Sequence, residues 1–229
     1  MDAYFDTLRQ AMTGARIMQH IRCAQWTVGV QSKTEMKLKQ KLARLILRRL
    51  GWTVVGVAPE HPRCVLIAAP HTSNWDFLYM LLYAAAFGLN VRWLAKKSLF
   101  NPLMGWFMRA LGGIAVDRDA AHGVVKELTE VFARESSLML VIPTEATRAR
   151  TPFWKSGFYR IAKGANVPIV PTFLDYKLRQ GGFGPALIPT DDVTADMQQL
   201  RDLYADKVGL YPDQFGPVRL REESRDGAA

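Results

Sequence analysis

A histidine and an aspartate stand five residues apart in the segment A-P-H-T-S-N-W-D-F at residues 69–77. His71 follows a strand-like run, and Asp76 falls in the first turn of a helix-like run that Ser73 is placed to cap. Within one helix, side chains five apart diverge by about 140°, but a loop histidine can meet a first-turn aspartate. A carboxylate that accepts one ring N–H leaves the other nitrogen free as a general base. The segment is therefore either a catalytic pair or only a well-capped helix start.

Two further segments place polar side chains after strand-like runs. G-G-I-A-V-D-R at residues 112–118 ends in Arg118, which is available either to a phosphate or to a local pairing with Asp117. V-I-P-T-E-A-T-R-A-R at residues 141–150 carries one carboxylate, one hydroxyl and two guanidinium groups, namely Glu145, Thr147, Arg148 and Arg150. Guanidinium groups bind phosphate oxygens in bidentate fashion, so this loop predicts an anion site. The alternative is a solvated loop with a local Glu–Arg pair.

The elements that must position these residues alternate along the chain. Strand-like runs lie at residues 52–57, 64–69, 91–95, 113–117, 138–143 and 168–176, and helix-like runs at 74–88, 102–111, 119–134, 155–165 and 193–208. This alternation predicts an α/β fold with a mostly parallel central sheet flanked by helices, whose sites form at the carboxyl ends of strands. The segment V-P-I-V-P-T-F at residues 167–173 contains an internal proline, which predicts an edge or irregular strand.

The N-terminal residues are distinctly basic. Residues 1–50 hold ten Lys and Arg against three Asp and Glu, so +7 of the formal net charge of +9 lies there. Residues 34–50 have helical periodicity, with an apolar stripe formed by Leu38, Leu42, Leu45, Ile46 and Leu50. Lys37, Lys41, Arg44 and Arg48 cluster on another face. This segment is either a surface helix docked on the core or a basic amphipathic helix in a membrane interface.

Length and composition indicate one substantial core. We expect an N-terminal membrane-associating helical arm at residues 1–50, a body at 51–215 and a mobile tail at 216–229. The two cysteines cannot form a disulfide framework, and no Cys/His cluster has the spacing of a metal site. No apolar run is long enough to span a bilayer, and no signal-peptide core follows the start. A basic arm on a nearly neutral body argues against a nucleic-acid binder.

In their order along the chain, these segments resemble the four sequence blocks of the glycerolipid acyltransferases, the family of lysophosphatidic acid acyltransferase. The resemblance runs from Pro70 to Phe173 and includes K-S-G-F-Y-R-I-A at residues 155–162. It implies a glycerol-3-phosphate acyltransferase-like fold and transfer of a fatty acyl group from acyl-CoA or acyl carrier protein to a hydroxyl of a lysophospholipid-type acceptor. We expect an enzyme without a cofactor or metal, bound to membrane lipids at the cytoplasmic face as a peripheral or monotopic protein.

Individual residues correspond to the family's blocks. His71 corresponds to the general base and Asp76 to its orienting partner. Arg118 matches the arginine of the second block. The third block, implicated in holding the acceptor's phosphate, is matched by Glu145, Thr147 and Arg148.

The third block departs from the usual F-P-E-G-T-R, because it reads P-T-E-A-T-R with Ala146 in place of glycine. Glycine permits backbone conformations and a close approach to a ligand that alanine restricts. The acceptor therefore stays open between a lysophospholipid, glycerol phosphate and a lipid with another head group. A catalytically inactive lipid-binding protein of the same fold is the alternative. A serine hydrolase is disfavoured because the chain lacks a G-x-S-x-G elbow.

Overall fold

The computed structural model describes residues 33–101, 104–116 and 121–223, and all structural statements below concern these residues. Seven strands form one sheet in the order β1-β7-β6-β2-β5-β3-β4. They are β1 (Thr53–Val55), β2 (Arg63–Ala68), β3 (Val91–Lys96), β4 (Gly113–Val116), β5 (Leu138–Pro143), β6 (Ile169–Asp175) and β7 (Gln180–Phe183). Only β7 runs antiparallel to a neighbour, β6, among the pairings of the described strands. The predicted mostly parallel α/β fold is confirmed.

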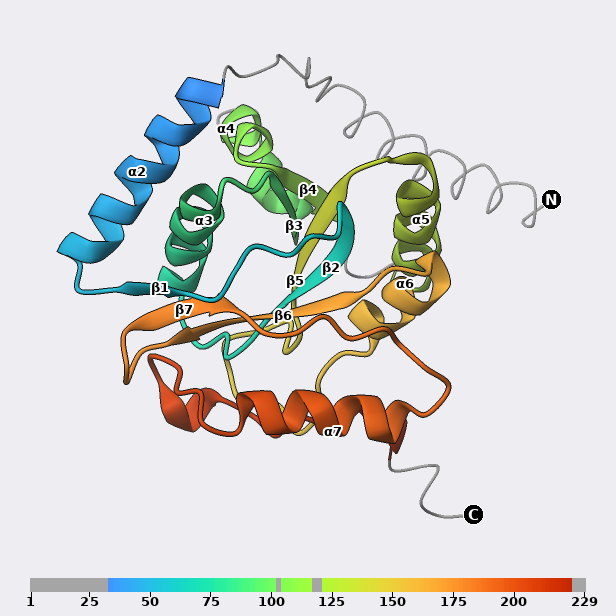
Figure 1. Cartoon of the computed structure of the whole chain (residues 1–229). Helices are drawn as coiled ribbons and strands as arrows, with labels where there is room; N and C mark the ends of the chain where they lie inside the picture. Colours follow the sequence, from blue (N-terminus) through green and yellow to red (C-terminus); the bar gives the residue numbers. More distant parts are fainter. Residues whose placement is uncertain (1–32, 102–103, 117–120, 224–229) are drawn as a thin grey trace.

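Helices cover both faces of this sheet (Figure 1). They are α2 (Lys33–Arg49), α3 (Trp75–Phe87), α4 (Gly105–Ala110), α5 (Ala121–Arg134), α6 (Gly157–Ala165) and α7 (Val193–Tyr204), with 3-10 turns η1 (Lys97–Phe100) and η3 (Pro212–Gln214). On one face, Val65 and Ile67 of β2 share a core with α5, α6 and α7. On the other, Cys64 and Leu66 of β2 pack with side chains of α3 and α4. The strand β2 is thus buried on both faces, as its continuous apolar run requires.

The β6–β7 hairpin differs from the prediction in two ways. Pro171 predicted an edge or irregular strand, yet β6 lies inside the sheet between β2 and β7. The hydroxyl of Thr172 donates to Ile67 O at 2.9 Å, which supplies the strand contact that a proline without an N–H cannot make. The strand β7 was not predicted from the sequence, because glycines are poor strand formers. Here they are required, since a Cβ on Gly181 would lie 2.7 Å from the Tyr83 ring.

The helix α2 docks on α3 through a narrow seam rather than through its apolar stripe. Ala43 and Leu47 are buried beside Trp52, Tyr83 and Ala86. The five residues of the stripe are between 37% and 68% exposed: Leu38, Leu42, Leu45, Ile46 and Leu50. Arg44, predicted to lie on the solvated basic face, is exposed and also donates from Nε to Ala86 O at 3.0 Å. The helix is therefore docked on the core and still presents an apolar stripe.

The C-terminal segment is packed further than predicted. We expected a mobile tail from Gly216, but Leu220 is buried and forms a bridge with Trp154. Arg201 on α7 also pairs with Glu223 at 2.6 Å. The described part of this segment therefore belongs to the body, because its apolar side chains complete the core on the α7 side. Residues 1–32 and 224–229 lie outside the described residues.

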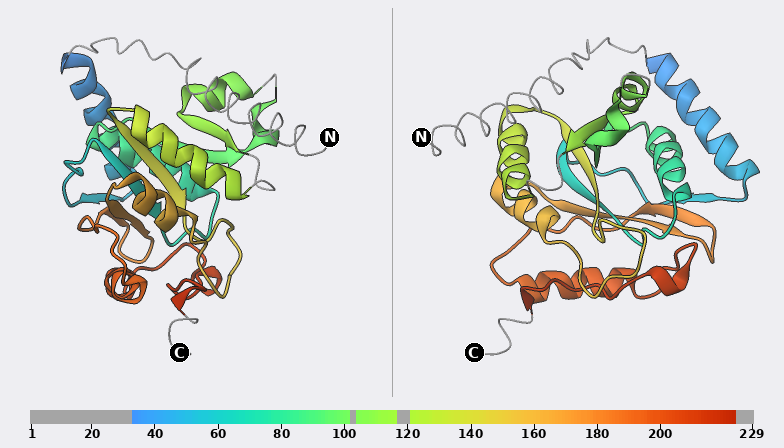
Figure 2. Two further views of the ribbon diagram at one scale, coloured as in Figure 1. Left: turned by 90° about the vertical axis from the view of Figure 1, so that its right-hand side faces the viewer. Right: turned by 180° about the vertical axis from the view of Figure 1, so that it is seen from behind.

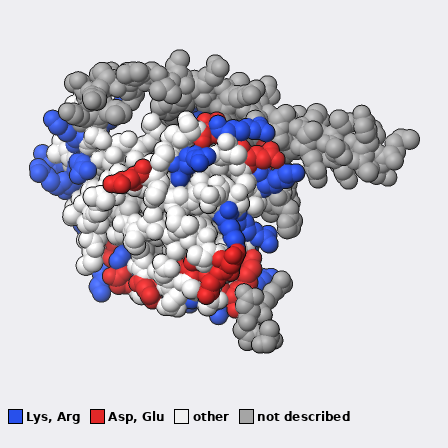
Figure 3. All heavy atoms as spheres, turned by 45° about the vertical axis from the view of Figure 1, so that its right-hand side comes forward, with Lys and Arg blue, Asp and Glu red and all other residues white. Residues whose placement is uncertain are grey.

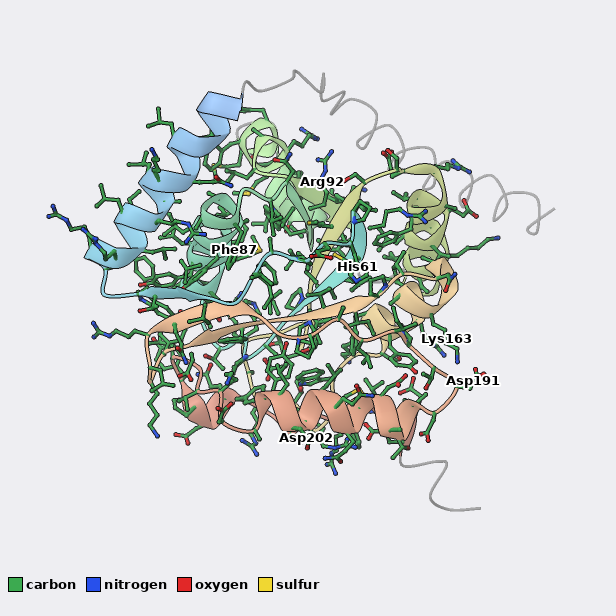
Figure 4. All side chains as sticks on the ribbon, viewed as in Figure 1. His61, Phe87, Arg92, Lys163, Asp191 and Asp202 are labelled. Atoms are coloured by element: carbon green, nitrogen blue, oxygen red, sulfur yellow. The ribbon has the colours of Figure 1, made fainter. Side chains whose placement is uncertain are left out.

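Charge is unevenly distributed over the described surface. α7 lies along one side of the sheet and α2 at the periphery in both views of Figure 2. Acidic side chains predominate around α7 at the lower part of the face in Figure 3, whereas the corner at α2 is basic. Exposed acids of the α7 region include Asp191, which pairs with Lys163 at 2.8 Å, and Asp202 (Figure 4). None of the helices described is both long and apolar enough to cross a membrane.

Candidate active site

The loop between β2 and α3 carries the histidine and the aspartate. The Asp76 carboxylate reaches back from the first turn of α3, and its Oδ2 accepts the backbone N–H groups of Thr72 and Ser73, both at 2.9 Å. The Ser73 hydroxyl accepts the N–H of Trp75 at 3.1 Å. The N-cap position of α3 is Asn74, whose side chain makes no cap hydrogen bond, so Ser73 is not the cap residue that the sequence predicted. Ser73 and Asp76 still satisfy N–H groups just before and at the helix start. These bonds also give the loop one fixed shape around Asp76.

This shape brings His71 and Asp76 together. His71 Nδ1 lies 3.2 Å from Asp76 Oδ2, and the two side chains are 20% and 7% exposed. The Asp76 carboxylate, which already accepts two backbone N–H groups, faces Nδ1 and therefore favours the tautomer with the proton on Nδ1. The other ring nitrogen, Nε2, is then a free proton acceptor on a side chain that solvent and ligands can reach. The same Asp76 carboxylate thus binds the N–H groups before α3 and faces the ring of His71.

Asp76 has a further partner that the sequence analysis missed. The hydroxyl of Tyr176, which directly follows β6, donates to Asp76 Oδ1 at 2.7 Å. The strand β6 pairs with β2, so its carboxyl end lies beside the loop that holds His71. Sites in α/β folds form at the carboxyl ends of strands, as predicted for β2 and β5, and this rule also applies to a tyrosine that directly follows β6.

The Glu145 side chain contacts the backbone of the histidine loop. It is buried, its Oε2 accepts the backbone N–H of His71 at 3.0 Å, and its Oε1 accepts that of Gly216 at 3.2 Å. Burial raises the pKa of Glu145, and the two backbone N–H groups partly oppose that rise. Both carboxylate oxygens are therefore engaged by the chain itself. Glu145 connects the end of β5, the His71 loop and the C-terminal segment.

The residues of the third block that follow Glu145 are more exposed to solvent. Thr147 and Arg148 are exposed, and Arg148 lines the cavity that also contains His71. Arg150 instead donates from Nη1 to Phe215 O at 2.8 Å. Ala146, which replaces the usual glycine, keeps a left-handed backbone with φ of 56°. The loop therefore holds the shape that a glycine would favour, at some conformational cost.

Arg118 lies outside the described residues. The strand before it, β4, is separated from β2 by β5 and β3. At about 4.8 Å per strand, the carboxyl end of β4 is roughly 14 Å from that of β2, along the same edge of the sheet.

An apolar cavity of about 530 Å³ extends from the His71–Asp76 pair. One side of α3 lines it with Phe77, Met80, Ala84 and Phe87, the last labelled in Figure 4. The rest of the wall comes from strands, the turn η1 and the helix α4, with Leu66, Trp93, Leu99, Met108, Val141, Leu174 and Phe183. Polar groups gather at the end where α3 begins, with His71, Asn74 and Arg148. The cavity is within the size range of small-molecule sites and suits a long apolar ligand whose reactive end lies at His71.

Comparisons with known proteins give a matching family and a similar solved structure. The model of a protein family described as Acyltransferase matches residues 54–175, which is more than half of the chain. Among solved structures, the chain is similar to the 1-acyl-sn-glycerophosphate (LPA) acyltransferase PlsC from Thermotoga maritima. The two share 16% identity and a TM-score of 0.49, over 99% of this chain and 93% of that one. No curated protein matches the sequence. From the extent of the family match, the chain belongs to the acyltransferase family.

Proposed function

We propose that this acyltransferase transfers a fatty acyl group from acyl-CoA or acyl carrier protein to a hydroxyl of a lysophospholipid-type acceptor. The observation that carries the proposal is the position of the His71–Asp76 pair at the polar end of an apolar cavity. The cavity accepts the acyl chain, and the thioester carbonyl then lies beside the histidine. Transfer of a chain that is insoluble in water requires such a shielded apolar site.

In this proposal His71 is the general base. Nε2 removes the proton from the acceptor hydroxyl as its oxygen attacks the thioester carbon, while Asp76 stabilises the imidazolium that forms. The tetrahedral intermediate then collapses, the carbon–sulfur bond breaks, and the departing sulfur takes the proton from Nε2. The ester and the free thiol leave, and the histidine returns to its starting state. No acyl group is attached to the enzyme at any step.

The acceptor's phosphate is held by cations at the mouth of the cavity. Arg148 lines the cavity at its polar end and Thr147 is exposed beside it, so both are accessible to a phosphate. We assign Arg118 to the same anion on the resemblance to the second block alone. Glu145, with both oxygens accepting backbone N–H groups, supports the loop instead of contacting the acceptor. A buried carboxylate would in any case repel a phosphate.

The enzyme acts at a membrane surface, on its cytoplasmic face, with α2 as one contact. The exposed stripe of α2 presents five apolar side chains, and Lys39, Lys41, Arg48 and Arg49 of the same helix are also exposed. Apolar residues beside basic ones are the composition of helices that lie in the interface of anionic bilayers. An acceptor that resides in the bilayer would then reach the site without crossing water.

Activity is tested with purified protein, radiolabelled acyl-CoA and acyl carrier protein donors, and an acceptor panel of lysophosphatidic acid, glycerol 3-phosphate and monoacylglycerol. His71→Ala should lower the rate about 10² to 10⁴ fold, because the general base is lost. The control is His61→Ala, which removes an exposed histidine outside the cavity (Figure 4) and should keep full activity. An active protein that is indifferent to His71→Ala would sink the assigned role. Lipid binding without turnover of any donor and acceptor would instead indicate a non-catalytic protein.

The acceptor class is tested with Arg148→Ala. We expect the KM for phosphate-bearing acceptors to rise about tenfold or more, because a charge-assisted hydrogen bond is lost, while the KM for monoacylglycerol stays the same. If monoacylglycerol is the better substrate of the wild-type protein and Arg148→Ala has no effect, the acceptor carries no phosphate.

Membrane contact is tested by changing the stripe without removing α2, because removal would expose the apolar seam beside Trp52. The double substitution Leu42→Ser with Ile46→Ser should reduce co-sedimentation with vesicles containing anionic lipid. Ile188→Ser is the control, since this exposed apolar residue lies after β7 and outside the α2 stripe. Equal binding by both variants would show that the stripe is not the anchor.

A further inference from the structure

We propose that Tyr176 is a positioning residue for the His71–Asp76 pair, and that its hydroxyl fixes the orientation of the Asp76 carboxylate. The proposal deepens the proposed function, since it rests on His71 as the base. Tyr176 does not line the cavity and lies beyond Phe173, where the resemblance to the four sequence blocks ends. It therefore acts through Asp76 and not on the substrate.

Tyr176 is held in place from several sides. Asp175 Oδ1 accepts the N–H groups of Lys177 and Leu178 and thereby shapes the turn after β6. The backbone N–H of Tyr176 donates to Val208 O at 2.8 Å. The tyrosine ring packs edge-on against Trp52, with ring centres 4.9 Å apart, and against Tyr79 of α3 at 6.0 Å. A side chain with this much support can orient a second one.

The two oxygens of Asp76 have different partners. Oδ2 accepts the N–H groups of Thr72 and Ser73 and faces His71 Nδ1. Oδ1 accepts the Tyr176 hydroxyl at 2.7 Å. The terminal torsion of aspartate is broad, and rotation about it moves both oxygens. The two backbone N–H groups restrain Oδ2 and the tyrosine bond restrains Oδ1, so together they set that torsion and the direction in which the imidazole is held.

Tyr176 is a permanent donor at the pH where the enzyme works. Burial raises the pKa of Tyr176 well above its usual value, and the hydrogen bond and charge of Asp76 raise it further. The other titratable or charged groups around the pair are Glu145 after β5, Tyr79 on α3, Tyr211 near the C-terminus and Arg148 at the cavity. None of these four side chains has a hydrogen bond to Asp76 in the described structure, whereas Tyr176 does.

Removal of this donor has two consequences. The carboxylate loses the restraint on Oδ1 and keeps only those on Oδ2, so its orientation is looser and His71 spends less time aimed at the acceptor. Without the tyrosine donor, the negative charge of Asp76 also stabilises the protonated form of His71 more strongly, so the imidazole keeps its proton up to a higher pH. A base that holds its proton more strongly becomes active only at higher pH, so the acidic limb of the rate profile moves upward.

The test compares Tyr176→Phe with Tyr159→Phe. Tyr159 makes the same kind of bond, donating its hydroxyl to the buried Asp196 at 2.6 Å, but between α6 and α7. We expect Tyr176→Phe to lower kcat about tenfold with KM within twofold. We also expect it to move the acidic limb of kcat/KM upward by roughly half a pH unit or more. In Tyr159→Phe the pH profile should match that of the wild-type protein, whatever the loss of stability.

A second measurement does not depend on turnover. The chain has four histidines, so the imidazole signal of His71 can be assigned by NMR with His71→Ala and titrated in each variant. Its midpoint should rise in Tyr176→Phe and stay unchanged in Tyr159→Phe. An unchanged midpoint in Tyr176→Phe, or equal shifts in both variants, overturns the proposal. If the wild-type protein transfers no acyl group, the proposed function fails, but this titration still decides whether Tyr176 controls the pair.

Discussion

Enlarging Ala84 should shorten the acyl chain that the protein accepts. Ala84 is buried on the side of α3 that lines the cavity, between Met80 and Phe87. Phenylalanine at this position would place its ring in the cavity and close off the end near Phe87. The end near His71 would keep its size, so short donors should still reach the site.

The size of the effect follows from the geometry of α3. From Phe77 to Phe87 the helix rises by about 15 Å, at about 1.5 Å per residue. The part beyond Ala84 is therefore about 4 to 5 Å long. With a carbon–carbon bond of about 1.5 Å, an extended chain advances roughly 1.3 Å per carbon, so this part holds three or four methylene groups. At about 0.8 kcal/mol for each methylene buried, their exclusion costs roughly 3 kcal/mol, or about a hundredfold in kcat/KM.

The assay offers Ala84→Phe a mixture of acyl-CoA donors of different lengths and measures the ester products by mass spectrometry. The preferred length should fall by about four carbons, with short donors used at the wild-type kcat/KM. Ala84→Ser, which is similar in size to alanine, should keep the wild-type preference. If a folded Ala84→Phe protein has an unchanged preference, the acyl chain does not occupy this cavity.

Substitutions at three positions test local features through the free energy of unfolding. Ala146→Gly should raise it by up to about 1 kcal/mol, because glycine adopts the left-handed φ of 56° without strain, whereas Ala146→Val should lower it by about 1 to 2 kcal/mol. Thr144→Val should raise it by about 1 kcal/mol, because the buried Thr144 hydroxyl has no hydrogen-bond partner among the described residues. Burial, and then the charge of Glu130, raise the pKa of Glu127 from 4.5 to about 7. The folded protein therefore keeps a proton that the unfolded chain releases, and stability is lost as the pH rises through 7. Glu127→Gln should add about 1 kcal/mol at pH 8, with allowance for partial exposure, and little at pH 4.

Urea denaturation at fixed temperature measures all three, with the Glu127 pair compared at both pH values. Equal stability of the glycine and valine variants at Ala146 would contradict the backbone argument. A loss of stability in Thr144→Val would mean that its hydroxyl has a partner. A gain in Glu127→Gln that is the same at pH 4 and pH 8 would rule out titration as its cause.

The amino-acid sequence by itself determined the class of fold and the central pair. Apolar runs that alternate with helical periodicity specify buried parallel strands with covering helices, because each period matches one geometry of the chain. His71 and Asp76 were found because both belong to one loop and the turn after it, where local spacing decides whether side chains meet. The capping role of Asp76 was visible for the same reason.

The tertiary structure decided what lies around that pair. Strand order places the ends of β5 and β6 on either side of β2, and so brings Glu145 to the backbone of His71 and Tyr176 to Asp76 across 100 residues of sequence. The cavity has no sequence pattern of its own, because its walls come from α3, several strands and the turn η1. Periodicity also could not tell which face of α2 would dock, since a seam of Ala43 and Leu47 suffices to bind it to α3. Such contacts depend on which strands and helices become neighbours in space. Short-range spacing along the chain does not encode that spatial order.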